Sequence, residues 1–237
     1  MRIDENLCIA CGSCVLFCPM GAISVREVAV IDLDECVECG VCYRAAVCPV
    51  DAFVPIVPQE AEFGRALRAV FSDPTTVHAG TGVAGRGTEE MKTNEVTGRF
   101  KVGRIGLGLE FGRPGIGTRL KDVDTVARAL APLGVHFEPK NPVTQLMEDV
   151  STGALRKDVL NEKVMSAIIE AEFPIEKTVE VLDAVRTASK KVDTVFSVEC
   201  INVVNPDGSL PLEKKLAELG IPKYINGKTN VALGRKS

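Results

Sequence analysis

The chain contains no tryptophan, two tyrosines and two histidines among its 237 residues. So few aromatic rings provide little surface for stacking on nucleic-acid bases, and we expect no nucleic-acid partner. No apolar run approaches the roughly 20 residues that a membrane-spanning helix needs. The first residues also lack a basic segment followed by an apolar run, which a secretory signal would require. The sequence therefore predicts a soluble, cytoplasmic protein.

Cysteine is absent from most of the chain and concentrated near its start. Eight of the nine cysteines lie between Cys8 and Cys48, and Cys200 stands alone among apolar neighbours. Clustered cysteines in a cytoplasmic protein favour metal ligation over disulfides. A lone cysteine in an apolar strand is typical of a buried thiol. This distribution predicts a small cysteine-ligated module at residues 1–57, followed by an ordinary globular body.

The module is an internal repeat. Its two cysteine runs read Cys8-x2-Cys11-x2-Cys14-x3-Cys18-Pro19 and Cys36-x2-Cys39-x2-Cys42-x5-Cys48-Pro49. Three thiolates at positions i, i+3 and i+6 wrap a short loop around one cluster, whose sulfurs the loop's backbone amides then face. A glycine follows the second cysteine of each run, where the missing Cβ permits close approach. Zinc is the alternative metal, but zinc sites favour paired C-x2-C units over a triplet with a remote fourth cysteine.

These runs closely resemble those of the bacterial two-cluster ferredoxins, over about a quarter of the chain. The resemblance implies a pseudo-twofold ferredoxin fold with two 4Fe–4S clusters that carry single electrons. It also implies that the cysteine before each proline ligates the cluster of the other run. The implied ligand sets are Cys8, Cys11, Cys14 and Cys48 for one cluster, and Cys36, Cys39, Cys42 and Cys18 for the other. The second run departs from the family in having five residues rather than three before its last cysteine, which puts the equivalence of the two potentials in question.

Acidic residues outnumber basic ones in the module. Residues 1–57 carry eight acids and three bases, a charge of −5 before any cluster is counted. Residues 86–121 are the opposite, with eight bases and four acids. Contact between these two surfaces would cover the clusters, so we expect each surface to bind a different partner instead. Residues 72–118 are then predicted to become ordered against a second subunit or an anionic ligand.

The remainder of the chain predicts an α+β protein, in which a linker at residues 58–100 joins the module to a small α/β or α+β sandwich domain at residues 101–237. Apolar periodicity distinguishes helices from strands along this domain. The predicted helices are 60–71, 119–133, 158–172, 174–191 and 212–219. The predicted strands are 101–111, 135–138, 193–204 and 224–233.

Two glycine-rich stretches raise the question of a second site. Gly80–Gly85 matches G-x-G-x-x-G, but no apolar strand precedes it and no helix start follows it, so a nucleotide site is the weaker interpretation. The second stretch lies between a predicted strand and a predicted helix with Thr118 at its N-cap, a context that suits a small anionic ligand. A solvated tight turn is the competing interpretation. The residues of this candidate anion site are Gly112, Arg113, Gly115, Gly117, Thr118 and Arg119.

The sequence favours an iron–sulfur electron-transfer subunit of a cytoplasmic, anaerobic, multi-subunit oxidoreductase. In this interpretation the C-terminal domain docks the module to a catalytic subunit that contains a flavin or a metal. Two other hypotheses stay open: a self-contained oxidoreductase with substrate or flavin in its C-terminal domain, and a redox- or ligand-sensing regulator. His78 and His136 are isolated in the sequence and are expected to be structural.

Overall fold

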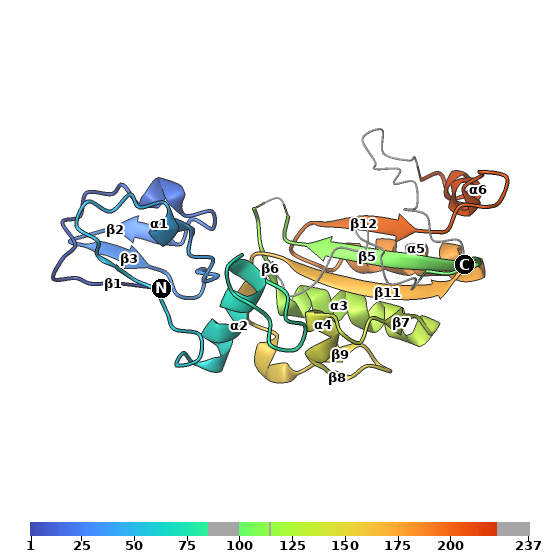
Figure 1. The fold of residues 1–237 in the computed structure, drawn as a ribbon, viewed down its shortest axis with the longest axis horizontal. Coiled ribbons are helices and arrows are strands. Elements are labelled where there is room, and N and C mark those ends of the chain that lie inside the picture. The colour runs from blue at the N-terminus through green and yellow to red at the C-terminus, as the bar shows by residue number, and fades with distance from the viewer. Residues whose placement is uncertain (85–99, 114, 222–237) are drawn as a thin grey trace.

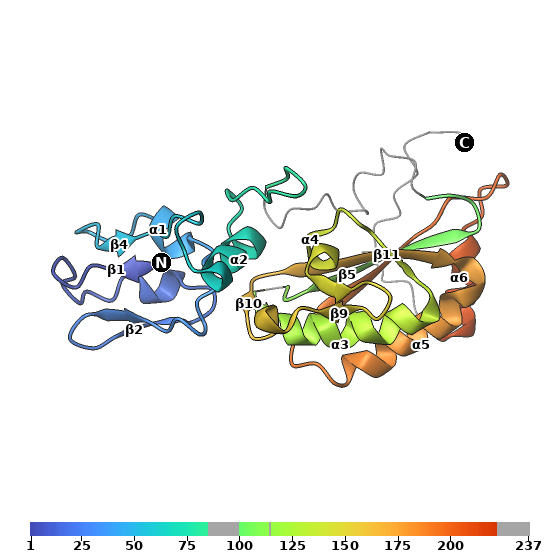
Figure 2. The same ribbon diagram turned by 90° about the horizontal axis from the view of Figure 1, so that it is seen from below.

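The computed structural model describes residues 1–84, 100–113 and 115–221. Figures 1 and 2 show a small N-terminal module beside a larger body, with helix α2 (Phe63–Ser72) between the two. The structure contains both helices and strands, which agrees with the α+β class predicted from the sequence. No helix in the described ranges is long and apolar enough to cross a membrane.

Short paired strands frame the module. Strand β1 (Arg2–Ile3) pairs with β4 (Phe53–Val54), and β2 (Ile23–Val25) pairs with β3 (Ala29–Ile31), both antiparallel. A 3-10 helix, η1 (Val15–Phe17), directly follows Cys14, and helix α1 (Val41–Arg44) contains Cys42. The buried core holds few side chains, and two of them are cysteines: Met1, Cys14, Ile23, Ala29, Cys42 and Phe53. A core of this size stabilises a segment of this length only marginally, so bound metal would add to its stability.

The body is built on a four-stranded antiparallel sheet. Its strands are β5 (Arg104–Phe111), β7 (His136–Phe137), β11 (Ala167–Pro174) and β12 (Phe196–Ile201), in the order β12-β5-β11-β7. Alternate residues of β5, such as Leu107 and Leu109, are fully buried in the body's core. Helices α3 (Leu120–Leu130) and α5 (Thr178–Ser189) pack side by side on one face of the sheet (Figure 2).

Shorter elements complete the body. Strand β6 (Thr118–Arg119) pairs with β10 (Lys163–Val164), and β8 (Met147–Asp149) pairs with β9 (Ala154–Leu155). The remaining helical turns are η2 (Ala131–Leu133), α4 (Pro142–Gln145), η3 (Lys157–Val159), η4 (Ile175–Lys177) and α6 (Pro211–Glu218).

The helix predicted at residues 158–172 is wrong, because this stretch contributes β10 and most of β11. Leu160, Val164 and Ile168 repeat at a helical spacing of four residues, which suggested the helix. The structure instead follows the alternation of Ala167, Ile169, Ala171 and Phe173, whose side chains all enter the core from one face of a strand. Pairing with β5 and β7 on both sides of β11 outweighs local helical preference.

The other predicted elements of the described ranges form, with shifted ends. The helix predicted from residue 174 starts as η4, and Thr178 opens the α-helix because Pro174 is the last residue of β11. The expected N-cap is also corrected: Arg119 occupies that position, and Thr118 lies within β6. The strand predicted at residues 224–233 lies outside the described residues.

Helix α2 belongs to the body on one side and reaches the module on the other. Leu67 and Phe71, one helical turn apart, are buried in the body's core. Arg65 and Arg68, three residues apart, instead donate hydrogen bonds to backbone carbonyls of the module. Since residues three and four apart share a helix face, α2 presents separate apolar and cationic faces.

Candidate metal centres

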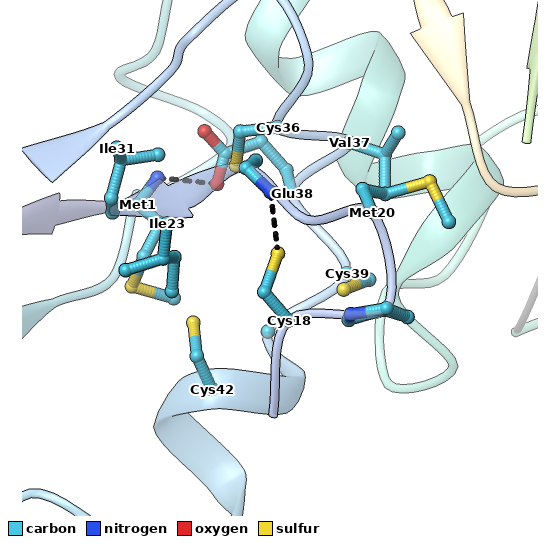
Figure 3. A pocket seen from close by; sticks show the side chains of 13 residues that line it. Met1, Cys18, Met20, Ile23, Ile31, Cys36, Val37, Glu38, Cys39 and Cys42 are labelled. Carbon is cyan, nitrogen blue, oxygen red and sulfur yellow. Dashed lines mark hydrogen bonds and ion pairs between the residues drawn. The ribbon is translucent and has the colours of Figure 1, made fainter. Parts of the chain in front are cut away.

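Four cysteines from both repeats line one pocket in the module. Cys36, Cys39 and Cys42 come from the second run, and Cys18 comes from the first. Figure 3 shows Cys42 extending from α1 toward Cys18, with Cys36 and Cys39 on the other sides of the same space. The rest of the lining is mostly apolar and includes Met1, Met20, Ile23 and Ile31.

A second pocket has the reciprocal composition. Cys8, Cys11 and Cys14 of the first run line it together with Cys48 of the second run. Ile3, Ile9 and Phe53 are among its apolar neighbours. The antiparallel pairing of β1 with β4 brings the two ends of the module together and places Cys48 beside the first run. Each pocket thus gathers three cysteines of one loop and the cysteine before proline of the other.

Backbone amides stabilise the sulfur atoms in both pockets. Ala22 N donates to Cys18 Sγ at 3.2 Å, and Ala52 N donates to Cys48 Sγ at 3.3 Å, four residues after the cysteine in both cases. Ala29 N donates to Cys8 Sγ at 3.3 Å. Such N–H donors favour a thiolate or a bridging sulfide over an uncharged thiol.

The pockets are otherwise unfavourable to thiolate charge. Burial raises the pKa of Cys42 to about 12, and burial also raises the pKa of Cys14 and of Cys39. The pKa of the exposed Cys11 is lowered, mainly by a hydrogen bond with the Ser13 side chain. Buried thiols of this kind lose their protons when a metal cation binds to the sulfur in place of the proton. The donor set therefore fits a group that supplies several cationic metal atoms to four sulfurs.

A single ion fits less well. Across residues 1–84, 100–113 and 115–221, no three cysteine, histidine or carboxylate side chains come close enough to hold one metal ion. All nine cysteines are free thiols rather than disulfides. Four sulfurs spread around a pocket suit a polynuclear cluster, whose irons and sulfides fill the space between them.

The predicted anion-site residues surround the turn between β5 and β6. Gly112 has a φ of +84°, and a Cβ at this position would lie 2.5 Å from the carbonyl oxygen of Met165. The two cations already have carboxylate partners: Arg113 pairs with Glu110 at 3.0 Å, and Arg119 pairs with Asp34 at 2.7 Å. Thr118 is buried and donates its hydroxyl to the carbonyl of Arg119. Gly115 and Gly117 also have positive φ. The anion site stays a prediction, and close packing explains Gly112 without it.

The contact at Arg119 corrects one expectation about charge. The acidic module and the basic part of the body were expected not to meet, yet Arg119 also pairs with Glu35 at 3.0 Å, and Lys163 contacts the same carboxylate. The contact involves the loop that carries Cys36, while Cys11 and Ile9 of the other loop stay exposed. The acidic module and the basic part of the body can therefore touch without covering both cluster sites, because their contact lies at one end of the module.

The other singled-out residues lie away from the cysteines. His78 contacts Thr81 within a loop closed by a bridge between Val77 and Ala84. This loop contains Gly80 and Gly82, while Gly85 lies outside the described residues. Sequence reasoning missed the cationic side chains around the Cys36 loop, because Arg65, Arg68 and Arg119 lie 27 to 85 positions from the loop residues that they contact.

Comparison with known proteins identifies two 4Fe–4S binding domains in the N-terminal segment, at residues 1–24 and 33–51. The pyruvate synthase subunit PorD of Methanothermobacter marburgensis is 46% identical over 50 residues, which are 21% of this chain and 57% of that protein. Ferredoxin-1 of Rhodobacter capsulatus is 48% identical over 40 residues, 16% of this chain and 62% of the ferredoxin. PorD of Methanocaldococcus jannaschii is 38% identical over 56 residues, covering 23% and 63% of the two chains. The matched stretches thus span less than two thirds of these relatives. No solved structure matches the chain.

Proposed function

We propose that this chain is an iron–sulfur electron-transfer subunit whose module holds two 4Fe–4S clusters in a pseudo-twofold arrangement. The observation that carries the proposal is the pair of reciprocal pockets, each lined by four cysteines. Two 4Fe–4S binding domains in the same segment support it. The proposed ligand sets are Cys8, Cys11, Cys14 and Cys48, and Cys36, Cys39, Cys42 and Cys18.

The module's own residues would hold the clusters and limit water around them. The cysteine thiolates supply the ligands, and the amides of Ala22, Ala29 and Ala52 stabilise sulfur charge. Apolar side chains such as Ile23 and Phe53 line the pockets and lower the local dielectric constant. When bound, each cluster supplies a one-electron redox couple at low potential.

We further propose that the body at residues 101–237 docks the module to a catalytic oxidoreductase subunit that contains a flavin or a metal. The relatives named PorD are subunits of pyruvate synthase, which supports a place in a multi-subunit oxidoreductase. We propose that this complex is anaerobic and cytoplasmic. The size of the body supports a docking role, since electron carriage alone requires only the module.

Metal analysis of the anaerobically purified chain tests the proposal. We expect about eight iron and eight acid-labile sulfide per chain, since two four-cysteine sites hold two cubanes. Reduction with dithionite should then produce the EPR signals of two interacting 4Fe–4S clusters. A protein that carries mainly zinc, or only about four iron, would contradict the two-cluster assignment. Co-purification of a flavin- or metal-containing subunit from the native host tests the docking role.

A further inference from the structure

Three arginines converge on the backbone of the loop that carries Cys36 and Cys39. Arg68 Nη1 donates to the carbonyls of Leu33, Asp34 and Cys36 at 2.8, 2.9 and 2.9 Å. Arg65 Nη1 donates to two of the same carbonyls, at 2.7 Å and 3.2 Å. From the other side, Arg44 Nη2 donates to the carbonyl of Cys39 at 2.6 Å. We refer to Arg44, Arg65 and Arg68 as the arginine clamp.

Three carboxylates of this loop, those of Asp34, Glu35 and Glu38, are paired with cations, and Arg44 of the clamp pairs with Asp73 at 2.9 Å. Arg65 and the N-terminal amino group of Met1 both contact the buried Glu38. Arg119 pairs with Asp34, and Lys163 with Glu35. The negative charge of the loop is therefore largely neutralised by the clamp and by the body.

The equivalent loop around Cys8 has a different environment. Asp4 and its counterpart Asp32 both accept a hydrogen bond from a backbone amide two residues later, and no cation pairs with either among the described residues. The difference lies at the carbonyls: within the same ranges, no arginine or lysine binds a carbonyl of residues 8–14, whereas arginines bind those of Leu33, Asp34, Cys36 and Cys39. Cys11 is exposed and Ile9 is 61% exposed, whereas Cys39 is only 8% exposed. The repeat of the sequence thus places two similar ligand sets in unequal electrostatic surroundings.

This inequality has a consequence for redox chemistry. Reduction adds one negative charge to a cluster, so nearby cations stabilise its reduced form and nearby anions destabilise it. A guanidinium that donates to the carbonyl oxygen of a peptide also polarises that peptide group. The N–H of the same peptide group then becomes a stronger hydrogen-bond donor. Arg68 and Glu38 are buried, which reduces screening by water and strengthens both effects. Burial also disfavours the added negative charge itself, so the clamp has to outweigh that cost.

We propose that the arginine clamp raises the reduction potential of the cluster held by Cys18, Cys36, Cys39 and Cys42 above that of the other cluster. A single electron added to the protein then resides at this cluster, on the side of the module that faces the body. Arg65 and Arg68 act as positioning residues, since they contact the loop rather than the cluster ligands' sulfurs. The inference rests on the proposed function, because it requires both clusters.

Redox titration of single-cluster proteins tests the inference. Cys11→Ala in the full chain removes one cluster and Cys39→Ala removes the other, so each potential can be measured by EPR during titration with dithionite. We expect the cluster retained in Cys11→Ala to have the higher potential. Adding Arg68→Gln should lower that potential by about 59 mV, a tenfold change for a one-electron couple. The same substitution in the Cys39→Ala background should have little effect.

Two further variants separate electrostatics from damage to the fold. Glu162 accepts a hydrogen bond from Arg68 Nε, so Glu162→Gln removes a compensating charge and should raise the same potential. Arg186 is exposed on α5 and pairs with Asp183, so Arg186→Gln is the matched control with no expected shift. If Arg68→Gln does not bind its cluster, Arg65→Gln and Glu162→Gln decide the sign.

The outcomes distinguish this inference from the proposed function. Two clusters of equal potential, or shifts of the same sign for Arg68→Gln and Glu162→Gln, would overturn the role of the clamp alone. An unsubstituted protein without two 4Fe–4S clusters would overturn the proposed function itself.

Discussion

Cys18 and Cys48 occupy equivalent positions in the two repeats, and each is followed by a proline. Proline fixes φ and lacks an N–H, which turns the chain away from the preceding loop. The amide four residues after each cysteine donates to its sulfur, at 3.2 Å for Cys18 and 3.3 Å for Cys48. At the scale of single residues, these contacts direct each sulfur into the pocket of the opposite repeat.

Loss of Cys18 should therefore damage the cluster of the second run. We expect Cys18→Ala to reduce the iron content from about eight to about four per chain, because only the set with Cys48 stays complete. EPR of the reduced variant should show the cluster of the Cys8 loop. Cys200→Ala serves as the control and should retain all the iron. Loss of the Cys8-loop signal in Cys18→Ala would refute the crossed ligand sets.

Cys200 is predicted to be chemically unreactive. Its side chain is partly rather than fully buried, since it lies in the edge strand β12 and packs against the body's core. Desolvation there raises its pKa to about 12 from the ordinary 9.0. The folded state holds this proton more tightly, so the resulting stability is present below pH 9 and is lost as the pH rises toward 12. At pH 8 we expect Cys200 in the native protein to react with iodoacetamide more slowly than in urea, because the folded state disfavours its thiolate. Equal rates in the two states would contradict this.

Among the elements of the body, the glycine-rich turn between β5 and β6 allows neighbouring backbone segments to pack closely. Gly112 N donates to Val195 O at 2.9 Å, which attaches the turn to the start of β12. The backbone of Met165, just before β11, lies directly against Gly112. A bulkier residue would separate the strands that form the sheet.

Two glycines of this turn provide a matched test. Gly112 and Gly115 both have positive φ, but a Cβ at Gly115 would meet open space while one at Gly112 would collide with Met165 O. We expect Gly112→Ala to cost about 3 kcal/mol, from a left-handed backbone and a steric clash, and Gly115→Ala about 1 kcal/mol from the backbone alone. Urea denaturation followed by circular dichroism measures both. Similar losses for the two variants would contradict the packing explanation.

Across the whole molecule, ion pairs connect the module to the body. Arg119 and Lys163 lie opposite each other in the β6–β10 ladder and together contact Asp34 and Glu35. Arg119 lowers the pKa of Asp34 through a hydrogen bond. The carboxylate therefore keeps its charge at mildly acidic pH, and its contribution is lost only as the pH falls through that lowered value.

Charge reversal should weaken this attachment. Arg119→Glu with Lys163→Glu replaces attraction to Asp34 and Glu35 by repulsion, so it should increase the population of the undocked form roughly tenfold or more. Small-angle scattering should report a larger radius of gyration, and high salt should have the same effect on the unsubstituted protein. Adding Asp34→Lys and Glu35→Lys should restore compactness. Failure of this restoration would show that other contacts maintain the docking.

The cysteine module could be predicted from the sequence alone, because its ligand spacing is local and repeats within 57 residues. Apolar periodicity also predicted helices α3, α5 and α6 and strands β5, β7 and β12 of the body, but not its remaining strands of two or three residues, which are too short to show a period. The central strand at residues 167–174 could not be predicted in this way, since pairing with neighbours on both sides imposes that conformation. Only the tertiary structure brought Arg68 and Arg119 to the Cys36 loop, because contacts between residues 32 to 85 positions apart leave no local pattern in the sequence.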